Sequence, residues 1–150
     1  MLRLKEKGEN MKVKIPIWIS VLQVILTLIM FQQVYQFTLD HQAVAQSGIT
    51  IEGTPNLNLL FEFAGRTATM AVASLLVIIL QNPRYFLVVL FMNLVREGLE
   101  TIIDPLYPLA NAPMAPVNDF IAHLVIVALE LWAFIVMYKI VKKMDANEKE

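Results

Sequence analysis

The chain has 150 residues, of which 57% are hydrophobic, and its net charge at pH 7 is −1. Soluble domains carry about 45–50% apolar residues, so the composition indicates an integral membrane protein, and the length favours one membrane domain over residues 1–150. The near-neutral charge offers no basic field for nucleic acid. The absence of cysteine excludes disulfides, thiol catalysis and iron–sulfur ligation.

Four apolar segments are long enough to cross a lipid bilayer, which takes about 20 helical residues. We expect helices at about residues 15–39, 57–80, 85–104 and 117–141. Glycine or proline lies in each connection between them, where these residues disfavour continued helix. The predicted fold is therefore all-α, an integral membrane four-helix up-and-down bundle.

The first segment also has features of a secretory signal, namely a basic start and the cleavage-like sequence Ala43-Val44-Ala45. However, its charge-free run from Ile15 to Phe31 is longer than a usual signal core. We therefore expect an uncleaved first helix.

Lysine and arginine are unevenly distributed among the ends and connections. They occur in residues 1–14, in the turn at 81–84 and in residues 142–150, but not in the other two connections. The positive-inside rule then places both tails and this turn in the cytoplasm. We expect a multi-pass protein of the bacterial cytoplasmic membrane with both termini cytoplasmic.

Charged residues interrupt the later segments at one predicted depth. At a rise of about 1.5 Å per residue, Arg66 lies about 12 Å below Asn58 and Arg96 lies about 12 Å below Asp104. Glu62 precedes Arg66 by one helical turn and shares its face. A charge at mid-bilayer costs about 2.5–3.5 kcal/mol, so these groups are expected to point into the bundle and to pair.

The third and fourth segments each carry a polar stripe on one helical face. Asn93, Glu97 and Glu100 form the first stripe, and His123 and Glu130 form the second. Asp104 and Asp119 continue the two stripes toward the outer surface. We therefore predict a buried charged pocket in the outer half of the bundle, with the ligand-binding residues Glu62, Arg66, Asn93, Arg96, Glu97, Glu100, His123 and Glu130.

We expect this pocket to bind a small polar or anionic ligand, or a lipid or quinone headgroup. The arginines would orient the ligand, and the acids would hold the arginines or relay protons. Histidine with carboxylates suits Zn, Fe or Mn, but neither Glu-x-x-His nor His-Glu-x-x-His occurs, so no metal site is predicted. Gly-x-Ser-x-Gly and glycine-rich phosphate loops are also absent, and no motif identifies catalytic residues or a cofactor.

Three stretches, FAGRTATMAVASLL, VREGLETIIDPLYP and VALELWAF, carry a family resemblance. With them, the chain resembles the small DoxX-like membrane proteins over roughly residues 57–139. The resemblance implies a four-helix bundle with both ends cytoplasmic, and some relatives are linked to quinone-coupled sulfur oxidation or oxidative-stress complexes. Two alternatives to ligand binding stay open: a quinone-linked membrane oxidoreductase subunit, and a non-catalytic partner subunit of a membrane complex. Association as a homo-oligomer or with a membrane partner protein also stays open.

Overall fold

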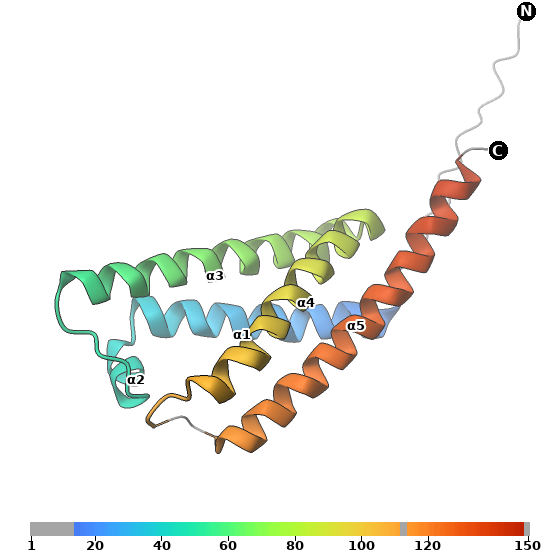
Figure 1. Cartoon of the computed structure of the whole chain (residues 1–150). Helices are drawn as coiled ribbons and strands as arrows, with labels where there is room; N and C mark the ends of the chain where they lie inside the picture. Colours follow the sequence, from blue (N-terminus) through green and yellow to red (C-terminus); the bar gives the residue numbers. More distant parts are fainter. Residues whose placement is uncertain (1–13, 112–113, 149–150) are drawn as a thin grey trace, which may run out of the picture.

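The computed structural model describes residues 14–111 and 114–148. Within these residues the secondary structure is entirely helical, which confirms the predicted all-α class. They form one short helix, α2 (His41–Gln46), and four long helices, α1 (Ile17–Thr38), α3 (Thr54–Leu80), α4 (Pro83–Leu106) and α5 (Pro116–Asn147). Figure 1 shows how these helices are arranged.

The sequence explains where the long helices begin and where α3 reverses into α4. Proline occupies the first turn of α3, α4 and α5, where its missing N–H and fixed φ are tolerated. Gln81 ends α3 in the left-handed conformation, with φ of 50°. The Asn82 side chain then accepts a hydrogen bond of 3.0 Å from the Arg84 backbone N–H, which caps α4.

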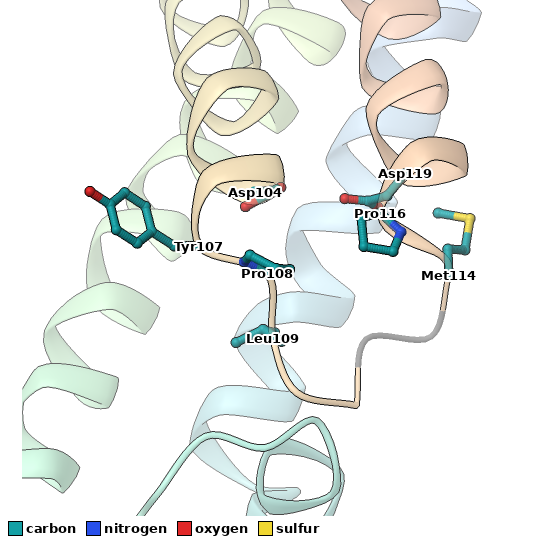
Figure 2. A pocket seen from close by; sticks show the side chains of 7 residues that line it. All are labelled: Asp104, Tyr107, Pro108, Leu109, Met114, Pro116 and Asp119. Atoms are coloured by element: carbon teal, nitrogen blue, oxygen red, sulfur yellow. The ribbon is translucent and has the colours of Figure 1, made fainter.

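The long helices form two antiparallel hairpins, α1 with α3 and α4 with α5. α3 and α4 meet at the Gln81–Asn82 turn and then diverge (Figure 1). We call the end that holds this turn the turn end, and the opposite end, which holds α2 and the connection from α4 to α5, the loop end. At the loop end, Asp104 of α4 and Asp119 of α5 lie near each other (Figure 2). Because α3 and α4 diverge toward this end while α4 and α5 stay together, the four long helices are not packed evenly along their length.

The helical surfaces fit a lipid bilayer. By length and apolar composition, α1, α3 and α5 could each cross a membrane. Large apolar side chains such as Leu28, Ile79 and Trp132 are exposed on these three helices. α4 is not among these three helices, and it carries charged residues from Arg84 near the turn to Asp104 near the loop end. The structure thus supports three apolar helices in a membrane, whereas the crossing of α4 stays a prediction.

Two helical segments lie outside the predicted boundaries. α2 forms within the first connection, where the Asp40 side chain accepts a hydrogen bond of 3.1 Å from the Ala43 N–H. α5 continues to Asn147, into the part of the chain predicted as a tail. Arg84 binds Asp145 and Glu148 at 2.7 Å each, which ties this extension of α5 to the turn end.

Small residues form one buried face of α3, the helix that packs against α1. Ala64, Thr67, Ala71 and Ser74 are all buried, and their spacing of three or four residues keeps them on one face. Small side chains let membrane helices approach closely. Gly65 does not contribute to this packing, because a Cβ placed there would meet nothing within 4 Å.

This close approach predicts that Ala71→Leu is destabilising. Ala71 is fully buried, and extra methylenes in a packed interface cost about 1–3 kcal/mol. The free energy of unfolding, measured by SDS titration in mixed micelles, should fall by that amount. Val72→Leu, at the neighbouring exposed position, is the matched control and should leave it unchanged; equal effects of the two substitutions would contradict the packing of α3 on α1.

Candidate functional site

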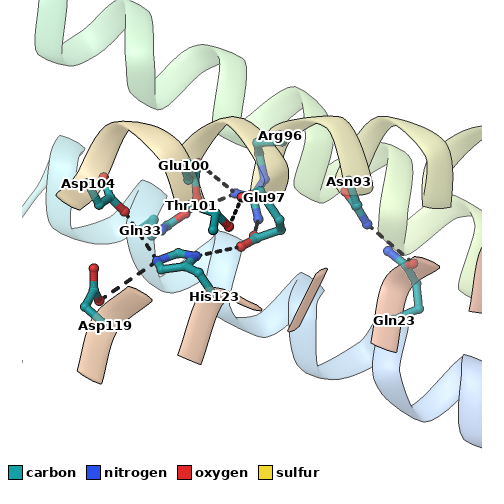
Figure 3. A network of polar contacts seen from close by, with 10 residues as sticks. All are labelled: Gln23, Gln33, Asn93, Arg96, Glu97, Glu100, Thr101, Asp104, Asp119 and His123. Carbon is teal, nitrogen blue, oxygen red and sulfur yellow. Dashed lines mark hydrogen bonds and ion pairs between the residues drawn. The ribbon is translucent and has the colours of Figure 1, made fainter. Parts of the chain in front are cut away.

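His123 of α5 lies between carboxylates of two helices in the loop-end half of the molecule (Figure 3). Its Nδ1 is 3.2 Å from Oε2 of Glu97. On the other side of the ring, Nε2 is 3.3 Å from Oδ2 of Asp104 and 3.9 Å from Oδ1 of Asp119. The stripes on α4 and α5 thus meet across the hairpin, as their spacing predicts for facing helices.

Arg96 joins the same group of side chains from α4. Its guanidinium contacts Glu97, lies 3.9 Å from Oε1 of Glu100, and makes a long contact of 3.5 Å with Oε1 of Gln33 on α1. The Glu97 side chain is only 5% exposed, so Arg96 supplies the charge that its burial requires. We name the acid–histidine cluster by its members, which are Arg96, Glu97, Glu100, Asp104, Asp119 and His123.

The acid–histidine cluster has an excess of negative groups. It holds four carboxylates, but only Arg96 and His123 can carry positive charge. Even with His123 protonated, at least two carboxylates lack a matching cation within the cluster. The arrangement therefore favours cations and hydrogen-bond donors over anions.

A second layer of polar side chains lies further from the loop end than the acid–histidine cluster, and each long helix contributes one of them. Gln23, Ser74, Asn93 and Glu130 are fully buried. Asn93 Nδ2 makes a long contact of 3.5 Å with Oε1 of Gln23, which Figure 3 shows beside the cluster. Among the described residues, neither carboxylate oxygen of Glu130 has a hydrogen-bond partner. The charges that act on Glu130 are Glu97, Arg96 and Glu100, so this residue lies within reach of the cluster.

The structure brings together six of the eight predicted residues and separates the other two. Glu62 and Arg66 pair with each other on α3 at 3.2 Å, with side chains 52% and 78% exposed. The expectation that they are buried with the others is wrong, because they lie on the face of α3 opposite the buried Ala64. Arg66 does reach the edge of a cavity of about 250 Å³ that Arg96 and Glu100 also line.

A larger cavity of about 620 Å³ lies at the loop end, where α3 and α4 diverge. We call it the loop-end cavity. Apolar side chains of α1 and α3 form much of its wall, among them Phe37, Leu60 and Phe63. Its polar lining includes Gln33, Glu100, Asp104 and His123. The cavity therefore joins an apolar wall to part of the acid–histidine cluster.

Two overlapping groups in the cluster could hold a metal ion, and both include His123. One comprises Glu97, Glu100 and His123; the other comprises Asp104, Asp119 and His123, with ligand atoms within 4.8 Å of one another in each group.

The predicted ligand-binding set does not include Asp104 and Asp119, although they continue its stripes. Gln23 was also missed, and its only sequence signal is an amide within the charge-free run of the first segment.

No protein-family model, curated protein or solved structure matches this chain.

The burial of Glu97 predicts a large effect of Arg96→Ala. Removing one partner of a buried ion pair costs about 3–5 kcal/mol, because it leaves an uncompensated charge. The free energy of unfolding in mixed micelles should fall by about that amount. The double variant Arg96→Ala/Glu97→Gln should regain part of the loss, since it removes both charges.

Arg84→Ala is the matched control, because this arginine also makes ion pairs but its side chain is 44% exposed. Exposed ion pairs contribute little to stability, so this variant should unfold almost as the unmodified protein does. Equal sensitivity of the two arginines would contradict the role assigned to Arg96.

Proposed function

We propose that the protein is a multi-pass membrane protein that binds a small amphipathic molecule in the loop-end cavity. The observation that carries this proposal is a cavity of about 620 Å³ whose lining combines apolar side chains with Glu100, Asp104 and His123. Its volume falls in the range of about 300–1,000 Å³ that is usual for small-molecule sites. The apolar body of the molecule would lie against Phe37, Leu60 and Phe63.

The polar lining defines the headgroup of the bound molecule. Glu100, Asp104 and His123 line the cavity, and no lysine or arginine is among its lining residues. A positively charged or hydrogen-bond-donating headgroup would satisfy these acceptors, whereas an anion would face carboxylates. The proposal thus keeps the polar ligand expected from the sequence, but it replaces the expected anionic headgroup with a cationic or hydrogen-bond-donating one.

In the same proposal, all four long helices cross the bilayer. The charged stripe of α4 supports this arrangement, because Asn93 and Glu97 are buried and His123 of α5 covers Glu97. The distribution of lysine and arginine supports a cytoplasmic turn end. The loop-end cavity would then open on the outer side of the membrane.

The alternative of a quinone-linked oxidoreductase subunit would use the same cavity. A quinol headgroup brings two hydroxyl donors, and His123 with its carboxylates could accept and pass protons. This alternative accords with the resemblance to the DoxX-like proteins, which stays a prediction. No feature of the described residues favours a non-catalytic partner subunit over ligand binding.

The headgroup preference can be tested with three probes of equal apolar length: hexylamine, hexanol and hexanoate. We expect hexylamine to bind at least about tenfold more tightly than hexanoate, because a hydrogen bond to a charged group contributes about 1.5–3 kcal/mol. Binding is measured on the full chain in nanodiscs from methyl NMR shifts of Ile49 and Ile103, which line the cavity. Tighter binding of hexanoate to the metal-free protein would overturn the assigned headgroup.

Filling the loop-end cavity provides the location test. Leu59 lines the cavity and is exposed, so Leu59→Trp should weaken hexylamine binding by about tenfold or more without loss of folding. The matched control is Leu76→Trp, an exposed position on the same helix, about 25 Å further along at 1.5 Å per residue. If Leu59→Trp binds hexylamine as the control does, the cavity is not the binding site.

A further inference from the structure

Three potential metal ligands converge at the loop end of the α4–α5 hairpin. Nε2 of His123 faces Oδ2 of Asp104 at 3.3 Å and Oδ1 of Asp119 at 3.9 Å. Metal–ligand bonds of about 2.0–2.2 Å require ligand atoms at about this mutual spacing. We propose that His123, Asp104 and Asp119 bind one divalent ion of a first-row transition metal.

The environment of the imidazole supports this assignment. Oε2 of Glu97 lies 3.2 Å from Nδ1 of His123 and can accept a hydrogen bond from the Nδ1–H, which leaves the lone pair on Nε2, the nitrogen that faces the two aspartates. Glu97 is itself buried and held by Arg96. Histidines that bind metals usually donate their other ring N–H to a carboxylate in this way, and the carboxylate fixes the ring orientation.

The charge around His123 also calls for a cation. Within the acid–histidine cluster, the carboxylates of Glu97, Asp104 and Asp119 lie 3.2 to 3.9 Å from the two ring nitrogens of His123. A divalent ion would offset negative charge that Arg96 alone does not balance.

Space for the ion and for further ligands is present beside the aspartates. A cavity of about 150 Å³ lies between Asp104 and Asp119 (Figure 2), which is enough for several water molecules. The three protein ligands would leave open coordination positions toward this cavity. One imidazole and two carboxylates suit Mn²⁺, Fe²⁺ or Zn²⁺, whereas Mg²⁺ and Ca²⁺ favour oxygen alone.

The alternative group of Glu97, Glu100 and His123 is less suitable. Arg96 contacts Glu97 and lies 3.9 Å from Glu100, so its positive charge would repel a metal ion there. Nδ1 of His123 already faces Glu97. We call His123, Asp104 and Asp119 the loop-end triad. In the described part of the chain, no arginine is among the contacts of its two aspartates.

This inference does not rest on ligand binding in the loop-end cavity, and its test needs no organic ligand. The full chain in nanodiscs of zwitterionic lipid is titrated with Mn²⁺, and free Mn²⁺ is followed by its EPR signal. We expect one ion per chain, with displacement by Zn²⁺ and little competition from Mg²⁺ or Ca²⁺. Pulsed EPR of the bound ion should show coupling to one imidazole nitrogen.

Substitutions assign the ligands. His123→Gln and Asp104→Asn should each weaken Mn²⁺ binding more than about 100-fold, and Glu97→Gln, which alters only the orienting carboxylate, about 10–100-fold. The matched control is Glu52→Gln, which removes an exposed acid elsewhere at the loop end and should leave the affinity unchanged. Retained affinity in His123→Gln, or bound Mn²⁺ without nitrogen coupling in the unmodified protein, would overturn the site; the second readout decides even if a variant fails to fold.

Discussion

The burial of Glu97 is the constraint on which the rest of the site depends. A carboxylate with a 5% exposed side chain in an apolar helical protein must be neutralised or paired, because its desolvation is costly. Arg96, one residue along α4, supplies the charge, and His123 of α5 closes the other side. These contacts determine which face of α4 meets α5. As a result, Asp104 and Asp119 lie at the same end of the hairpin.

The two ends of the molecule differ because their packing differs. At the turn end, Ile19, Phe86, Leu90 and Met137 form a buried apolar cluster with their neighbours, and the two hairpins are in contact. Toward the loop end, α3 and α4 diverge (Figure 1), and the space between the hairpins becomes the loop-end cavity. The apolar cluster thus closes one end, while polar groups and open volume gather at the other.

Periodicity predicted the part of the site that depends on helix faces. The stripes on α4 and α5 correctly identified Glu97, Glu100 and His123 as neighbours, since charged faces in an apolar chain must meet each other. The same reasoning was wrong for the burial of Glu62 and Arg66, because a pair within one helix can neutralise itself without turning inward. The sequence patterns tested for a metal site place all their ligands on one helix. They could not reveal the group of His123, Asp104 and Asp119, because its members come from both α4 and α5.

The loop-end cavity and the proposed metal triad share His123 and Asp104, so occupancy of one site would affect the other. A divalent ion on the triad would cancel the negative charge that favours a cationic headgroup in the cavity. By thermodynamic linkage, a cationic ligand would weaken metal binding by the same factor. With the ion bound, its open coordination positions would instead favour a ligand that offers an oxygen or carries negative charge. The metal state of His123 would therefore determine which class of headgroup the cavity accepts.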